Sequence, residues 1–232
     1  YSLEMPDTLY FAGERVPVGY FDVREDLDRE PLVNTYWQSH TLLLIKRANR
    51  YLPIIDSILE ANDVPEDFKY VPLIESELTN AVSPAGAVGI WQFLSGTARD
   101  YGLEVNSQID ERYHVEKATE AACHFFKESY KKFGSWTLAA ASFNYGRSAL
   151  NRQLERQEAD SFYNLILNQE TARYIYRILA LKLILDDPAQ YGFNIRPEDL
   201  YYPIPSYEVE VDNTVEDFAK FAKAHSINYK YL

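Results

Sequence analysis

Apolar side chains recur at helical spacing through the central part of the chain, from about residue 36 to residue 185. In the first stretch the repeating positions are Leu44, Ala48, Leu52, Ile55 and Leu59. A helix returns to the same face every three to four residues, so this spacing predicts a helix with one buried face. Pro53 falls inside the stretch and lacks the backbone N–H that an interior helical position donates. We therefore predict either two helices here or one helix that bends at Pro53.

Residues that begin and end helices mark the later elements. Apolar spacing over residues 115–133 predicts a long helix that Gly134 would end, and Ser135 can cap the helix after it. A last helix is expected over residues 170–185, where an Asp-Asp-Pro sequence follows. The central domain, residues 36–200, is accordingly expected to be all helical.

The two ends of the chain follow other patterns. Residues 1–35 carry scattered Pro and Gly and a mostly acidic stretch without a sustained period, so we expect an extended N-terminal arm. After a linker with two prolines, polar and apolar side chains alternate over residues 207–211 as in a β-strand. Residues 214–224 then suit a short amphipathic helix. We predict that residues 201–232 form a linker and a short α/β tail.

The composition favours one folded domain with a sugar ligand rather than a nucleic-acid ligand. The chain has 232 residues, of which 47% are hydrophobic, which suffices for one sizeable core. Its 19 Tyr offer flat apolar faces with a hydroxyl at the edge, which suit sugars. The formal net charge of -12 argues against a nucleic-acid partner, because phosphate binding needs clustered Lys and Arg.

The cellular compartment and the oligomeric state are left open by the sequence. Cys123 is the only cysteine, so no internal disulfide can form, and oxidising compartments also hold proteins without disulfides. No stretch is long and apolar enough to span a bilayer, and no signal sequence precedes Tyr1. Because Tyr1 stands where an initiator Met would, removal of an export or lipoprotein signal and trimming of the chain both fit. A membrane tether would then lie outside this chain.

Glu75 is the candidate with acid/base chemistry. It follows a mostly apolar run, residues 71–74, and burial against such neighbours disfavours the charged carboxylate and raises its pKa. A general acid that works near neutral pH needs such a shift. Taken alone, a carboxylate in this position is more often the exposed face of an amphipathic helix.

Four short motifs give Glu75 a specific context. They are Glu-Ser at 75–76, Ser-Pro-Ala-Gly-Ala-Val-Gly-Ile-Trp-Gln-Phe at 83–93, Ala-Ser-Phe-Asn-Tyr-Gly at 141–146 and Glu-Thr-Ala-Arg-Tyr at 170–174. In this order and spacing they resemble the motifs of the soluble-type lytic transglycosylase domain, and within it the membrane-bound lytic transglycosylase D group. The resemblance implies a mainly α fold similar to goose-type lysozyme. It also implies an enzyme that cleaves peptidoglycan glycan strands in the periplasm or cell envelope.

The resemblance assigns a role to individual residues. Glu75 corresponds to the catalytic acid, and Ser76 to the serine paired with it in the Glu-Ser motif. Ser83 corresponds to a serine whose hydroxyl lies near the scissile sugar. Gln92 would hydrogen-bond the sugar beside the cut. Asn144 matches the asparagine of an Ala-Tyr-Asn-Ala-Gly motif, although its flanking residues differ here.

Tyr174 corresponds to the tyrosine whose hydroxyl reaches toward the catalytic glutamate, and Gly86 and Gly89 would let the backbone come close to substrate. Each residue alone has a plainer explanation. The glycines could form turns, Gln92 could be a solvated helical residue, and Tyr174 could belong to the core. Their joint order is what favours a site.

The resemblance also implies a mechanism that uses one carboxyl twice. Ordinary glycosidases use two carboxylates, whereas Glu77 would point to nearly the opposite side of a helix from Glu75. In the family one Glu protonates the leaving sugar and then takes the proton of the substrate's C6 hydroxyl. That hydroxyl closes onto C1 and leaves a 1,6-anhydro-N-acetylmuramoyl end. No metal or cofactor is implied, since no Cys/His cluster of ligand spacing exists.

Two other functions stay open at this point. A hydrolase of the goose-lysozyme type would need a second carboxylate to activate water and would give reducing ends. A catalytically silent peptidoglycan-binding protein is the other alternative. The tail, residues 201–232, resembles the start of a LysM-type peptidoglycan-binding module, and we expect it to be incomplete because the chain stops before a second strand.

Overall fold

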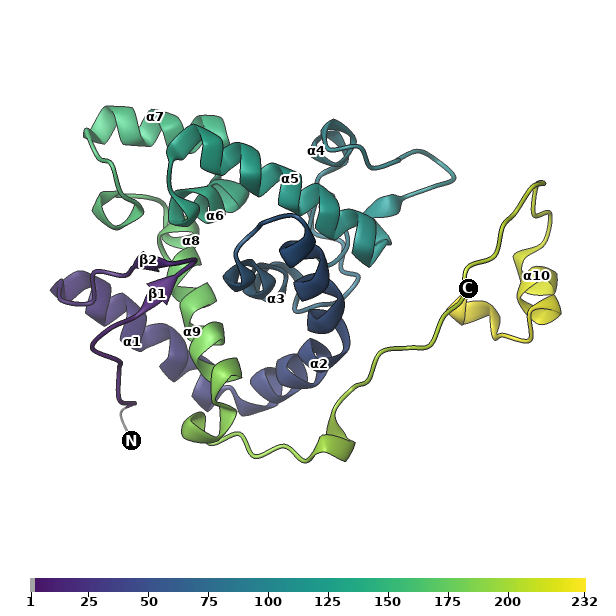
Figure 1. Cartoon of the computed structure of the whole chain (residues 1–232), viewed down its shortest axis with the longest axis horizontal. Coiled ribbons are helices and arrows are strands. Elements are labelled where there is room, and N and C mark those ends of the chain that lie inside the picture. Colours follow the sequence, from purple (N-terminus) through teal and green to yellow (C-terminus); the bar gives the residue numbers. More distant parts are fainter. Residues whose placement is uncertain (1–2) are drawn as a thin grey trace.

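Helices make up most of the chain in the computed structural model, which describes residues 3–232. In chain order the α-helices are α1 (Phe21–Tyr36), α2 (Gln38–Ala61), α3 (Val71–Ser76), α4 (Ser95–Asp100), α5 (Val115–Phe133), α6 (Trp136–Tyr145), α7 (Arg147–Gln157), α8 (Gln169–Ala172), α9 (Tyr174–Asp186) and α10 (Phe218–Ala224). The 3-10 helices are η1 (Glu66–Tyr70), η2 (Glu111–Tyr113), η3 (Phe162–Asn164), η4 (Pro188–Tyr191), η5 (Pro197–Asp199) and η6 (Tyr229–Tyr231). Strands β1 (Tyr10–Phe11) and β2 (Glu14–Arg15) form an antiparallel hairpin. The predicted mainly α fold is confirmed (Figure 1).

The long helix α5 runs through the core and packs against α2 and α6. Its ends follow the sequence signals, because Gly134 closes it with a φ of 66° and the Ser135 hydroxyl caps α6 by accepting a hydrogen bond from the Leu138 N–H. Three consecutive alanines of α6, residues 139–141, are completely buried. Their small side chains let α6 lie close to its neighbours.

Aromatic rings tie these helices to the loop of residues 83–93. The ring of Phe126 on α5 lies 4.3 Å from Phe68, 5.1 Å from Phe143 and 6.0 Å from Trp91, measured between ring centroids. The buried indole N–H of Trp91 donates to the hydroxyl of Thr119 at 2.9 Å. The loop therefore packs, through Trp91, against a cluster of buried aromatic rings.

For two predicted helices, the structure decides whether the helix is continuous or broken. The stretch around Pro53 is one helix, α2, and Figure 1 shows its ribbon turning partway along. A proline cannot donate to the carbonyl four residues earlier, which allows such a bend. The helix predicted over residues 170–185 is present as α8 and α9, with a break at Arg173.

The prediction of an extended arm over residues 1–35 is wrong for its second half. Residues 21–36 form helix α1, which packs along α9. Val23, Leu27 and Pro31 recur every four residues and are buried against this partner. The apolar face of α1 is hard to recognise in the sequence, because it is narrow and includes a proline. Burial on a distant helix, not local propensity, stabilises α1.

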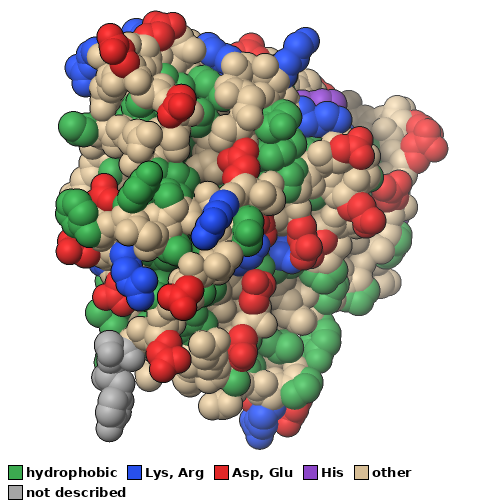
Figure 2. All heavy atoms as spheres, turned by 60° about the vertical axis from the view of Figure 1, so that its left-hand side comes forward, with side chains coloured by type: hydrophobic (Ala, Val, Ile, Leu, Met, Phe, Trp, Pro, Cys, Tyr) green, Lys and Arg blue, Asp and Glu red, His purple; other side chains and the backbone are tan. Residues whose placement is uncertain are grey.

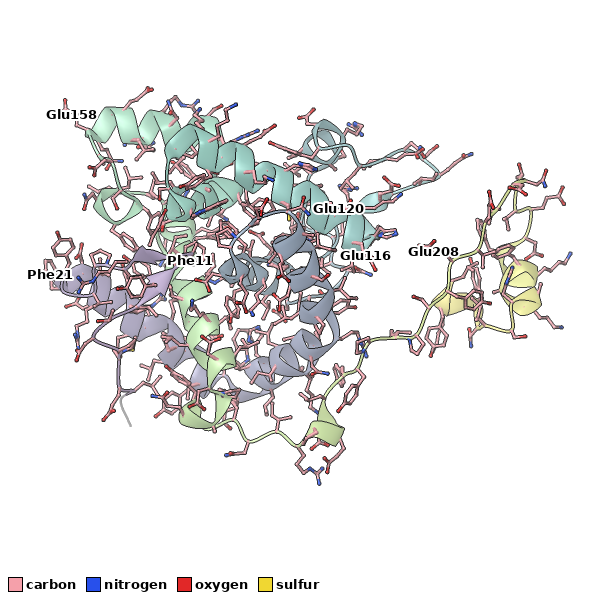
Figure 3. The ribbon with its side chains drawn as sticks, viewed as in Figure 1. Phe11, Phe21, Glu116, Glu120, Glu158 and Glu208 are labelled. Atoms are coloured by element: carbon pink, nitrogen blue, oxygen red, sulfur yellow. The ribbon has the colours of Figure 1, made fainter. Side chains whose placement is uncertain are left out.

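The rest of the arm, residues 3–20, is fastened to the helical domain. Phe11 is completely buried and packs on Phe68, whereas Phe21 at the start of α1 points outward (Figure 3). The Ala12 N–H donates to the Asp67 carboxylate at 2.6 Å. Glu14 caps the N-terminus of α6, where its carboxylate accepts from two backbone N–H groups and two hydroxyls, of Ser135, Trp136 and Thr137, at 2.6 to 2.9 Å.

The tail lacks the predicted strand. Residues 207–211 have no β-ladder partner among the described residues, and without a partner strand the backbone groups of a single strand stay unpaired. The predicted helix over residues 214–224 is present in shorter form as α10. Figure 1 shows this tail extending away from the helical domain. Hydrogen bonds from Asn49 and Arg50 to the backbone of Tyr201 and Tyr202 fix its starting point.

We expect Glu14→Ala to lower the free energy of unfolding by about 2 kcal/mol, because it removes a charge-assisted cap from α6. Urea unfolding followed by circular dichroism measures this loss. Glu120→Ala, on the exposed face of α5, serves as the control and should leave the midpoint unchanged. Equal urea midpoints for Glu14→Ala and Glu120→Ala would show that the Glu14 cap does not stabilise α6.

Candidate functional site

Glu75 lies near the end of α3, a six-residue helix between η1 and the loop of residues 83–93. Val71, Pro72 and Leu73 of this helix are buried, and they place Glu75 where protein surrounds most of its carboxyl group. Burial raises the pKa of Glu75 to about 7, against the opposing effects of a Tyr174 hydrogen bond and the nearby Arg177 charge. The Glu170 carboxylate adds to the rise. A carboxyl with this pKa can give and take a proton near neutral pH.

Tyr174 contacts Glu75 directly. It is the first residue of α9, it is buried, and its hydroxyl donates to Oε1 of Glu75 at 2.5 Å. Burial and the Glu75 carboxyl raise the pKa of Tyr174 well above its usual value, so the hydroxyl stays protonated and remains a donor. The hydroxyl position implied by the family resemblance agrees with this contact.

A cavity of about 600 Å³ gathers four of the predicted residues, Glu75, Ser83, Gln92 and Asn144. Aromatic and aliphatic side chains contribute to its walls, namely Phe93, Leu94, Phe125, Phe143 and Tyr145. A cavity that combines flat apolar walls with a few hydrogen-bonding groups suits a sugar. The four residues come from α3, two places in one loop, and α6.

A second cavity, of about 330 Å³, is also lined by Glu75. The two sets of lining residues share no other member. Glu75 therefore lies where the two cavities meet, as a residue acting on a bond between two adjacent sugars would.

The two serines hold backbone in place. The Ser76 hydroxyl is buried and donates to the Ile90 carbonyl at 2.8 Å, which ties α3 to the loop, and the Pro72 carbonyl also lies 3.2 Å from it. The Ser83 hydroxyl accepts from the Ala87 N–H at 3.0 Å and stabilises the turn that contains Gly86. Ser83 lines the larger cavity, while Ser76 lines the smaller one.

Gln92 and Asn144 are held by their amide groups. Gln92 has a left-handed φ of 51°, and its Nε2 donates to the carbonyls of Ala81 and Gly89. Its Oε1 has no donor among the described residues and is available to a ligand. The Asn144 oxygen accepts from the Thr171 hydroxyl at 2.8 Å. Both amides are thus oriented before any ligand arrives.

Two further carboxylates lie near Glu75. Glu170 lines the larger cavity and accepts from Nδ2 of Asn144 at 3.3 Å. Glu170 is the first residue of the Glu-Thr-Ala-Arg-Tyr motif, and this is the sequence signal that could have identified it. The family resemblance gave it no role. Glu77 lines the smaller cavity together with Glu75. The inference that Glu77 points to the opposite side is wrong, because α3 ends at Ser76 and Glu77 takes a left-handed φ of 55°.

Gly89 serves a different purpose from the one implied by the resemblance. A Cβ at this position would lie 2.0 Å from the Arg112 carbonyl oxygen, so its backbone approaches protein. Arg112 in turn braces the loop, since its guanidinium donates to the carbonyls of Gly86 and Phe93 at 3.0 Å and pairs with Asp110 at 2.7 Å. Gly86 has open space around it.

Within residues 3–232, no group of three His, Cys, Asp or Glu side chains is arranged to hold a metal ion. The helices in that range include none that is both long and apolar enough to cross a membrane. The charged side chains on the face shown in Figure 2 are predominantly acidic, in keeping with the net charge of -12.

Comparison with known proteins assigns the fold to a class. Residues 53–166 match the transglycosylase SLT domain, and the chain contains a domain of that family. Its helical fold is of the lysozyme-like kind expected for the domain. Residues 207–232 match the C-terminal LysM-like domain of soluble lytic transglycosylases.

Curated relatives extend the match beyond this domain. The chain is 30% identical over 202 residues to membrane-bound lytic murein transglycosylase D of Escherichia coli strain K12, an alignment that covers 83% of this chain. The protein of the same name from Escherichia coli O6:H1 gives the same values. The alignment covers 44% of the relative, so the chain spans less than half the length of these proteins.

We expect Gly89→Ala to destabilise the protein by roughly 1 to 3 kcal/mol more than Gly86→Ala does, since only the former drives a methyl group into a backbone carbonyl. Both glycines have a φ near +79°, so the strain of a left-handed alanine is common to the pair and cancels in the comparison. Thermal and urea unfolding measure the difference. Equal losses would show that the Arg112 contact does not constrain position 89.

We expect Tyr174→Phe to raise the pKa of Glu75 above about 7. The hydroxyl stabilises the charged carboxylate, so its removal favours the protonated form. Carbon-13 NMR of labelled glutamate carboxyls measures the titration directly. Tyr130→Phe, which removes a hydroxyl with no hydrogen-bond partner among the described residues, should leave it unchanged. A lower pKa in Tyr174→Phe would contradict the assigned contact.

Proposed function

We propose that this chain cleaves the β-1,4 bond between N-acetylmuramic acid and N-acetylglucosamine in peptidoglycan, as a lytic transglycosylase with Glu75 as its acid and base. The observation that carries the proposal is the position of Glu75, half-protonated near neutral pH where two cavities meet. The SLT domain and the relatives named as lytic murein transglycosylases support the reaction type.

In the first step Glu75 gives its proton to the glycosidic oxygen, and the bond from that oxygen to C1 of the muramoyl sugar breaks. Positive charge develops at C1, where the carbonyl of the sugar's own N-acetyl group can stabilise it. In the second step the Glu75 carboxylate takes the proton of the C6 hydroxyl as its oxygen bonds to C1. The product is a 1,6-anhydromuramoyl end, and no water is consumed.

The surrounding residues support both steps. The Tyr174 hydroxyl holds one oxygen of Glu75 at 2.5 Å and so fixes the direction of the other oxygen. The fixed amides of Gln92 and Asn144 and the Ser83 hydroxyl line the cavity beside Glu75 and would hydrogen-bond the sugars there. Ser76 holds α3 against the loop. No step requires a metal or cofactor.

A hydrolase is the second candidate, and the carboxylates of Glu170 and Glu77 are the observation that favours it. Either could activate a water molecule if its distance from the scissile bond allowed this. The products separate the two reactions. Hydrolysis in H₂¹⁸O places the heavy oxygen at C1, whereas the transglycosylase product contains no solvent oxygen.

Peptidoglycan lies in the cell envelope, so the proposal also places the chain there. The match of residues 207–232 to a LysM-like domain supports a peptidoglycan partner. The word membrane-bound in the name of the relatives supports tethering at a membrane, with the tether outside this chain.

We expect Glu75→Gln to reduce glycan cleavage at least about a hundredfold, because the amide keeps the shape but removes both the acid and the base. Mass spectrometry of digested peptidoglycan measures the rate and identifies anhydro ends. Glu120→Gln, on the exposed face of α5 and outside the lining of both cavities, is the control and should cleave at the wild-type rate.

Glu77→Gln and Glu170→Gln complete the experiment. The transglycosylase reaction predicts that the Glu75 substitution is the most damaging of the three and that wild-type products carry anhydro ends. Reducing ends, together with a loss in one of the other two variants as large as in Glu75→Gln, would favour the two-carboxylate hydrolase instead.

A further inference from the structure

The smaller of the two cavities beside Glu75 is built partly from residues outside the SLT match. Asn34 of α1, His40 and Leu44 of α2, and Arg177 and Leu181 of α9 all line it, and none of them falls within residues 53–166. The chemistry of this cavity therefore depends on α1, the first part of α2 and α9 as well as on the matched residues.

Arg177 is a cationic side chain of this cavity that forms no close ion pair there, although its charge opposes the rise in the Glu75 pKa. Its Nη2 donates to the Ile74 carbonyl at 3.4 Å, and no ion pair to it occurs among residues 3–232. Arg173, one turn earlier, shows the contrast, because it binds both oxygens of the buried Glu30 carboxylate at 2.7 and 3.1 Å. A guanidinium has five N–H donors, so most of those of Arg177 remain free of described partners.

The acids in the same cavity leave the Arg177 charge uncompensated. The Glu77 carboxylate is already engaged by His40 Nε2 at 3.0 Å and by the Arg47 guanidinium at 3.5 Å. The Glu75 carboxyl forms no ion pair with Arg177, and with a pKa of about 7 it carries only part of a negative charge near neutral pH. Asn34 and Thr79 add neutral polar groups to the wall. The cavity therefore offers a guanidinium with free N–H donors beside the hydrogen-bonding groups of Asn34 and Thr79, which suits a carboxylate.

We propose that Arg177 binds a carboxylate of the peptidoglycan substrate in this cavity, and the inference rests on the proposed function. Peptidoglycan offers this group from two sources. One is the lactyl carboxylate of muramic acid in strands that have lost their peptides. The other is a carboxylate of the peptide stem in strands that retain them. In either case Arg177 determines which strands are bound next to the acid that cuts them.

Binding is measured on the full chain carrying Glu75→Gln, so that the glycans stay intact, by calorimetric titration with three glycans. The first carries peptide stems, the second is stem-free with lactyl carboxylates, and the third is the stem-free glycan with those carboxylates converted to neutral methylamides. We expect an added Arg177→Gln to weaken binding about tenfold or more to at least one carboxylate-bearing glycan. Binding to the methylamide glycan should not change.

Arg177→Lys and Arg156→Gln are the comparison variants. Lysine keeps the charge without the planar fork, so it should recover part of the lost affinity. Arg156 is an exposed residue of α7 outside both cavities, and its substitution should leave all three affinities unchanged. Loss confined to the stem-free glycan identifies the lactyl group, and loss confined to the stem-bearing glycan identifies the peptide.

Equal weakening on charged and neutral glycans, or no weakening on either, overturns the inference. An equal effect would mean that Arg177 acts only on the structure, because the Glu75→Gln chain carries no Glu75 charge. The pH profile of Arg177→Gln with native Glu75 measures separately how Arg177 affects the Glu75 pKa. Failure of the proposed function gives a different result, since the wild-type chain would then release no anhydro ends from any glycan.

Discussion

The Glu75 carboxyl has to be kept out of water and yet remain within reach of a large substrate, and most of the architecture serves this requirement. Desolvation is the dominant cause of its raised pKa. Six residues of α3 could not maintain such a position alone, because an isolated helix of that length does not form in water. Its surroundings must therefore supply the stability that the helix lacks.

Those surroundings come from distant parts of the chain. The loop after α3 is held from one side by the Ser76 hydroxyl and from the other by the buried Arg112 guanidinium. Helix α9 adds the Tyr174 hydroxyl and the Arg177 side chain, and α1 in turn covers α9. An acid that is costly to bury thus depends on hydrogen bonds from Ser76, Arg112 and Tyr174, which come from three separate parts of the chain.

Sequence patterns predict the parts of this architecture that depend on local signals. The ends of α5 and α6 follow from Gly134 and Ser135, and the motif order correctly groups residues that line one cavity, although their roles stay predictions. Helix α1 escapes prediction because contacts with α9 stabilise it. The position of Glu77 escapes because helical periodicity was applied one residue beyond the end of α3.

The cap that Glu14 places on α6 also affects the order in which the protein can be made. Its carboxylate and the Ser135 hydroxyl are 121 residues apart in sequence. Ribosomes add about 5 to 20 residues per second, so the N-terminal segment waits for at least several seconds before its partner helix exists. During that interval Phe11 can meet Phe68 once residue 68 has been made, but the Glu14 carboxylate has none of its α6 donors to accept from. The native arrangement of this domain can be completed only late in translation, when both ends of that contact are available.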